Sequence, residues 1–119
     1  AEGVLTLELT LTGPTYPNAA AVRSTYRDLW AGLEAVPGVT AAGGVTALPL
    51  SNFFAWGPIT IEGRAPQPGE AFINADQRTV GGRYFEAMRI PLLQGRLFTP
   101  SDTADQPRVV IIDARLARD

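Results

Sequence analysis

Apolar and polar residues alternate strictly along residues 4–11, which read V-L-T-L-E-L-T-L. Side chains of a strand point to opposite faces in turn, so the leucines would line one face and Thr6, Glu8 and Thr10 the other. The pattern therefore predicts a half-buried β-strand at the start of the chain.

After the turn residues 12–17, apolar residues recur with the period of a helix. Asn18 is a favoured N-cap residue, and Pro37 with Gly38 provides a stop signal, so we expect a helix over residues 18–36. Its apolar stripe, spaced for one helix face, consists of Ala19, Val22, Tyr26, Leu29, Trp30 and Leu33.

Shorter patterns fill the rest of the chain. They predict strands over residues 39–48, 59–62, 72–80 and 109–112, an extended stretch over 92–98, a short helix over 83–88 that Pro91 ends, and a last helix capped by Asp113. This order predicts an α+β fold, a two-layer sheet with helices on one face and split β-α-β (ferredoxin-like) elements. The expected shared core comprises Leu5, Leu7, Leu9, Val22, Leu29, Trp30, Leu33, Val110 and Ile112.

Composition narrows the possible functions. The 119 residues are 45% apolar, enough for one domain with a core, and the net charge of -2 argues against nucleic acid as a partner. The chain has no His and no Cys, and all of its basic residues are Arg. We therefore expect no catalytic residues, no cofactor and no metal site built on imidazole or thiolate, and hence no enzyme. No apolar run approaches the about 18 residues of a membrane span.

Three polar groups could still carry chemistry, but a simpler interpretation is preferred for each. A Gly-Gly pair before a helix is usually a tight turn, carboxylates on strands and helices usually face water, and acidic loop residues without alternating ligands usually form a polar turn. The groups are Gly81-Gly82-Arg83 as an anion site, Glu62 with Asp76 and Glu86 as acid/base carboxylates, and Asp102 with Asp105 as a calcium loop.

Two sets of aromatic residues differ in their setting. Tyr26 and Trp30 are one helical turn apart on the apolar stripe, which favours core packing over ligand stacking. Phe53, Phe54 and Trp56 lie in an expected loop, where no periodicity requires burial. We expect these three residues to contact a partner, because aromatic residues are enriched at binding hot spots; folding back over the sheet is the alternative.

Four segments in order carry a family resemblance: P-G-V-T-A-A-G with A-L-P-L (37–50), I-T-I-E-G-R (59–64), Y-F-E-A-M-R-I-P-L-L-Q-G-R-L-F (84–98) and V-V-I-I-D-A-R-L-A-R (109–118). They resemble the MacB-like periplasmic core domain of bacterial ABC transporter permeases. The third segment is the most specific, because its Y-F, I-P-L and G-R-x-F elements have the family spacing.

The resemblance implies a non-catalytic extracytoplasmic, periplasmic domain of a permease in the bacterial inner membrane. Such a domain couples ATP-driven motion to substrate export or to periplasmic partners: another permease subunit or domain, the ABC ATPase through the whole protein, and a periplasmic adaptor or lipoprotein. The chain starts at Ala1 without Met and stops at Asp119. We therefore expect residues 1–119 to be one domain fragment of a longer permease, truncated at the C-terminus. A small-ligand-binding α+β module is the alternative, and a carboxylate-only hydrolase is a more remote one.

Overall fold

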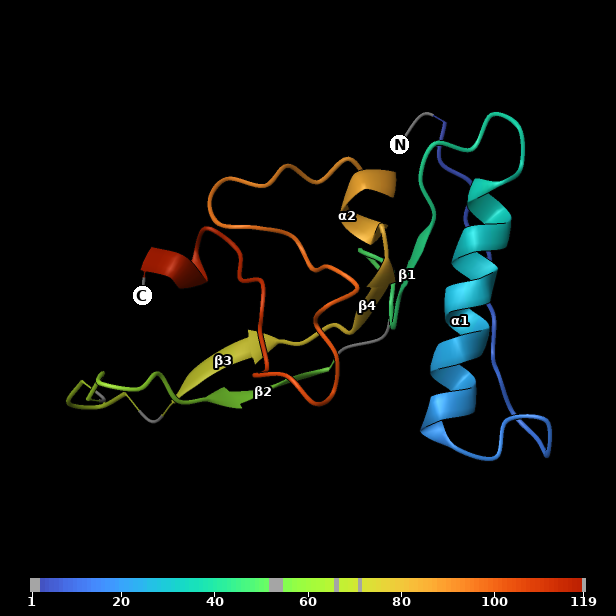
Figure 1. Ribbon diagram of the computed structural model, residues 1–119. Helices are drawn as coiled ribbons and strands as arrows, with labels where there is room; N and C mark the ends of the chain where they lie inside the picture. The colour runs from blue at the N-terminus through green and yellow to red at the C-terminus, as the bar shows by residue number, and fades with distance from the viewer. Residues whose placement is uncertain (1–2, 52–54, 66, 71, 119) are drawn as a thin grey trace.

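The longest element of the chain is the helix α1, Ala19–Glu34 (Figure 1). The structure, a computed structural model, describes residues 3–51, 55–65, 67–70 and 72–118. The Asn18 side chain caps α1 by accepting a hydrogen bond from the backbone N–H of Ala21 at 2.9 Å. After the helix, Gly38 adopts a φ of 89° that favours glycine. The helix and its cap are confirmed, and the helix ends two residues earlier than expected.

Within the described residues, four short strands form two separate antiparallel pairs. β1, Gly43–Val45, pairs with β4, Val80–Gly82. β2, Trp56–Ile59, pairs with β3, Ile73–Asp76. Figure 1 shows β1 and β4 between α1 and the β2–β3 pair. The fold is a mixed α+β fold, and its strands do not form one continuous sheet.

The second helix, α2, Tyr84–Ala87, follows β4 directly. It ends where Ile90 donates a backbone hydrogen bond to the Phe85 carbonyl oxygen at 2.8 Å, just before Pro91. The short helix is confirmed. Near the other end of the described chain, Asp113 caps the single 3-10 turn η1, Leu116–Arg118, through its Oδ1. That predicted cap is confirmed too.

Two predicted strands are wrong. Residues 4–11 and 109–112 belong to no strand and run as coil in Figure 1. Their apolar side chains are largely exposed, with Leu5 at 92% and Val110 at 81%. A period of two shows that a segment suits a strand, but a strand forms only when a neighbour supplies the ladder of hydrogen bonds. Because residues 4–11 are not a strand, α1 does not connect two paired strands in the described part of the chain.

The strand predicted over residues 72–80 divides into β3 and β4 because the chain changes partner there. Gln77 donates its backbone N–H to the Ala55 carbonyl oxygen at 2.7 Å, continuing the ladder with β2. Two residues later, the Thr79 carbonyl oxygen accepts from the backbone N–H of Thr46, extending the ladder with β1. The other bounds shift as well: 39–48 shortens to β1, and 59–62 moves back to β2.

The packing centre is small and lies where α1 meets β1 and β4. Trp30 contacts three glycines, and the apolar residues that count as buried in the described part of the chain are Ala42, Ala47 and Tyr84, each 7–8% exposed. The predicted core is wrong for the residues that remain exposed, namely Leu5, Leu7, Leu9, Val110 and Ile112. Val22, Leu29, Trp30 and Leu33 are half-buried.

The molecule is elongated as a consequence of this small packing centre. Its radius of gyration is 16.8 Å, compared with about 13.5 Å for a compact chain of this length. Among the described residues, no helix is both long and apolar enough to cross a membrane.

Candidate functional site

A tight turn after β1 presents a leucine to solvent. Ser51 donates its backbone N–H to the Leu48 carbonyl oxygen at 3.1 Å, which closes the turn. Leu50 within it has a φ of 65° and a side chain 104% exposed. A left-handed conformation is uncommon for a non-glycine residue and costs about 1–2 kcal/mol. An exposed leucine held in this conformation is a feature that core packing does not explain.

Trp56 lies a few residues further on, at the first position of β2. It pairs in register with Asp76 of β3, and its side chain is 65% exposed. Phe53 and Phe54, the other two residues of the predicted partner contact, lie outside the described residues. Trp56 and Leu50 are thus the large exposed apolar side chains that the structure places on either side of this loop, and a partner contact there stays a prediction.

A cleft of about 550 Å³ lies beside the turn. The turn and the end of the β1 segment supply its apolar wall, β3 and the crossing to β4 supply charged groups, and α2 supplies an aromatic ring. Its described lining residues are Ala47, Pro49, Leu50, Ser51, Asp76, Arg78 and Tyr84. The volume is within the range of about 300–1,000 Å³ that small-molecule sites occupy.

The cleft contains both signs of charge and two hydroxyl groups. Arg78 donates from Nη1 to Oδ1 of Asp76 at 2.7 Å. Burial raises the pKa of the Tyr84 hydroxyl, and the positive charge of Arg78 acts in the opposite direction, so that charge is felt at the phenol. Oγ of Ser51 is buried and has no hydrogen-bond partner within the described part of the chain. Buried polar atoms without partners are rare in proteins, and a ligand is one way to satisfy them.

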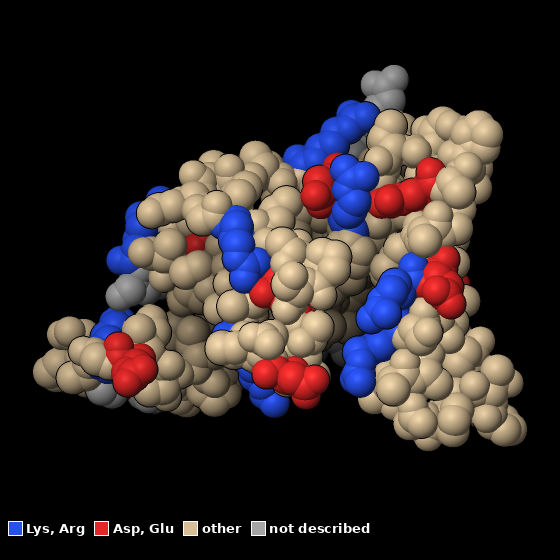
Figure 2. All heavy atoms as spheres, in the orientation of Figure 1, with Lys and Arg blue, Asp and Glu red and all other residues tan. Residues whose placement is uncertain are grey.

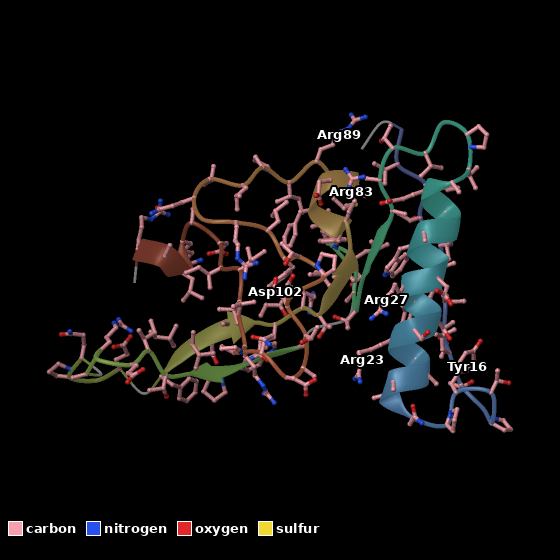
Figure 3. The ribbon with its side chains drawn as sticks, viewed as in Figure 1. Tyr16, Arg23, Arg27, Arg83, Arg89 and Asp102 are labelled. Carbon is pink, nitrogen blue, oxygen red and sulfur yellow. The ribbon has the colours of Figure 1, made fainter. Side chains whose placement is uncertain are left out.

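The expected tight turn at Gly81-Gly82 is wrong: both glycines belong to β4, where they pair with Gly44 and Gly43 of β1. Gly82 has a φ of 58°, and the Trp30 ring packs against both glycines. The side chain of Arg83 donates to the Thr40 carbonyl oxygen at 3.0 Å and therefore binds the protein itself (Figure 3). These glycines serve the packing of α1.

The three carboxylates considered as acid/base groups do not share a partner in the part of the chain that the structure describes. Asp76 pairs with Arg78, whereas Oε1 of Glu86 lies 3.8 Å from Nε of Arg83. Glu62 is exposed. Among the described residues, no group of three or more potential metal ligands of the His, Cys, Asp or Glu type occurs. The three carboxylates thus form no common cluster among the described residues.

Asp102 belongs to a polar turn, as the simpler interpretation predicted. Its carboxylate accepts from both terminal nitrogens of Arg96, at 2.8 and 2.7 Å, and from the backbone N–H of Thr99 at 2.8 Å (Figure 3). These hydrogen bonds to Arg96 and Thr99 lower the pKa of Asp102 to about 2. Both oxygens are occupied within the protein, and Asp105 makes no contribution to these bonds.

Charge over the visible face is mixed in sign. Figure 2 shows basic and acidic side chains interspersed, often next to each other, with no broad region of one sign. This distribution provides no extended basic surface of the kind that attracts nucleic acid.

The cleft was not predicted from the sequence. Its residues come from three separate stretches of the chain, and no spacing pattern links Ser51, Arg78 and Tyr84. The one available signal was the proline next to Leu50, which marks a turn beside an apolar residue. Comparisons with protein-family models, with curated proteins and with solved structures find no match for this chain.

Proposed function

We propose that this chain is a non-catalytic extracytoplasmic domain of a bacterial ABC transporter permease. In this role it passes ATP-driven motion to the exported substrate or to a periplasmic partner. The observation that carries the proposal is the exposure of Leu50 and Trp56 on either side of residues 51–55. Exposed aromatic and aliphatic side chains beside a turn suit a contact that forms with another subunit or domain.

The third resembling segment adds support through its local structure. Tyr84, the first residue of that segment, is 7% exposed and anchors α2 against β1. Phe85 contacts both Tyr84 and Phe98, with ring centroids 5.5 and 6.4 Å apart. The two ends of the segment are therefore linked by aromatic contacts, which gives the Y-F and G-R-x-F elements a common structural role.

The proposal includes a finer architecture than the mixed α+β fold. In the whole permease, residues 4–11 and 109–112 would pair with β1 and β4 in one sheet of the split β-α-β type. The exposed leucines of the first segment and the apolar V-V-I-I run of the second support this arrangement, because both patterns suit buried strands.

Hydrogen exchange tests the finer architecture. The amides of Leu7 and Val110 should exchange rapidly in the 119-residue chain and slowly in the whole protein. Rapid exchange of both amides in the whole protein would contradict the single sheet. The gene sequence around this domain gives a separate check, because a permease requires apolar segments of about 20 residues on both sides of it.

Transport by the whole protein tests the contact itself. Leu50→Ser and Trp56→Ser should each reduce transport while leaving the thermal stability of the isolated domain unchanged, because both side chains are exposed. Leu93→Ser is the matched control, since Leu93 is 79% exposed and lies away from the turn in sequence. Equal transport by all three variants would contradict the proposed contact.

A small-ligand-binding module is the second candidate function. The cleft beside the Leu48–Ser51 turn favours it, because that cleft combines a large volume with convergent polar groups.

A further inference from the structure

The cleft beside the turn is lined by apolar residues and by a closely spaced pair of opposite charges. We propose that it binds a free amino acid with an aliphatic side chain, held as a zwitterion. This inference is independent of the permease proposal, because it depends only on residues that this chain brings together.

The hydroxyl and guanidinium groups of the lining residues suit the α-carboxylate. Ser51 and Tyr84 both line the cleft, and each has a hydroxyl that can donate to an anion. Arg78 lines the same space and provides the positive charge that favours a carboxylate there. Ligand binding would also give Oγ of Ser51 the partner that it lacks within the described part of the chain.

Asp76 suits the α-ammonium group. Its carboxylate is 2.7 Å from Nη1 of Arg78, and 47% of its side chain remains exposed, so a second cation can approach from the solvent side. A simple anion would have to compete with Asp76 for the charge of Arg78. A zwitterion instead places one charge against each member of the pair, which favours an amino acid over an inorganic anion.

The apolar wall determines the side chain of the ligand. Its apolar residues are Ala47, which is 8% exposed, and Pro49 and Leu50. This wall offers contact to methyl and methylene groups and no further charge. An aliphatic amino acid is therefore expected to bind more tightly than glycine, by about 0.8 kcal/mol for each buried CH₂ group.

Binding of L-leucine to the 119-residue chain tests the proposal directly. In titrations up to about 10 mM, followed by the amide shifts of a ¹⁵N-labelled sample, we expect saturable changes at Ser51, Asp76 and Arg78. Leucinamide lacks the carboxylate and 4-methylpentanoate lacks the ammonium group, so each should bind at least about tenfold more weakly, a loss of about 1.4 kcal/mol. No saturable shift with leucine, or equal binding of the three compounds, would overturn the inference.

Two variants and a matched control locate the site. Ser51→Ala and Asp76→Asn should each weaken leucine binding several-fold while the spectrum of the free protein stays folded. Asp102→Asn removes the carboxylate from a second Arg–Asp pair, with the same 2.7 Å separation but outside the cleft, and should leave binding unchanged. A loss in Asp102→Asn as large as that in Asp76→Asn would show that the cleft is not the site.

Tyr84→Phe tests the contribution of the hydroxyl independently of the ring. This variant keeps the buried ring, so the fold should persist, and it removes one donor to the carboxylate. We expect weaker binding of leucine with little change in the weak binding of leucinamide. If both compounds lost affinity equally, the hydroxyl would not be recognising the carboxylate, and the assigned orientation of the ligand would be wrong.

Discussion

Trp30 of α1 lies directly against Gly44 of β1. A Cβ atom built on Gly44 would be only 2.7 Å from Cη2 of the indole and 3.0 Å from Cζ2. The same ring approaches Gly81 and Gly82 of β4, where an added Cβ would lie 3.3 Å from Nε1 and 2.9 Å from Cγ. The absence of side chains at these positions allows the helix to pack closely against the β1–β4 pair.

Gly44→Ala should therefore destabilise the protein. The new methyl group overlaps the indole, and either Trp30 or the strand must move, which typically costs about 1–3 kcal/mol. Urea unfolding followed by tryptophan fluorescence measures the change. Gly57→Ala is the control, because no atom lies within 4 Å of an added Cβ there. Similar losses for the two variants would contradict the proposed importance of the Trp30 contact.

The cap of α1 gives a second prediction. Replacing Asn18 by Ala removes the acceptor for the Ala21 N–H and should reduce the free energy of unfolding by about 0.5–2 kcal/mol. Asn18→Asp keeps a capping oxygen and should retain most of that stability. Urea unfolding of both variants provides the comparison, and equal losses would show that the side-chain oxygen is not what stabilises the helix end.

Local signals in the sequence predicted the elements that form locally. Asn18 caps the start of α1, Gly38 lies in the turn that follows its end, and Pro91 follows the end of α2, because caps and breakers act within a few residues. Strands were less predictable. Whether residues 4–11 form a strand depends on a partner elsewhere in the chain, and the leucine alternation contains no information about that partner.

In the candidate site, too, local features were predictable and long-range ones were not. The sequence predicted that Trp56 lies near a turn, and the structure shows that its side chain is exposed. The cleft could not be predicted from the sequence, because Asp76 of β3 and Arg78, which follows β3, share a cleft with Ser51 only once the strands have paired. Sites made of long-range neighbours require the topology to be known first.

The different burial of two leucines predicts different losses of stability when each is replaced by alanine. Leu29 is half-buried on α1, whereas Leu7 is 65% exposed. Leu29→Ala should cost about 1–2 kcal/mol, less than the about 2–5 kcal/mol of a fully buried leucine, and Leu7→Ala should change stability by less than about 0.5 kcal/mol. Parallel urea titrations measure both. A larger loss for Leu7 would mean that residues 4–11 pack into a core within this chain.

The Arg96–Asp102 pair gives a prediction of pH dependence. The pKa of Asp102 is about 2 in the folded protein, against about 3.9 for an aspartate in an unfolded chain. Because the folded value is the lower one, the ionised carboxylate stabilises the fold above the unfolded pKa, and this contribution is lost as the pH falls from about 4 towards 2. An NMR titration of the side-chain carboxyl carbon should show its midpoint near 2. Arg96→Gln should raise that midpoint, although the Thr99 N–H still donates to the carboxylate. In Asp102→Asn, the free energy of unfolding should fall less steeply over the same pH interval than in the unmodified chain. A midpoint close to 4 in the unmodified protein, or identical slopes for the two proteins, would show that this pair does not form in solution.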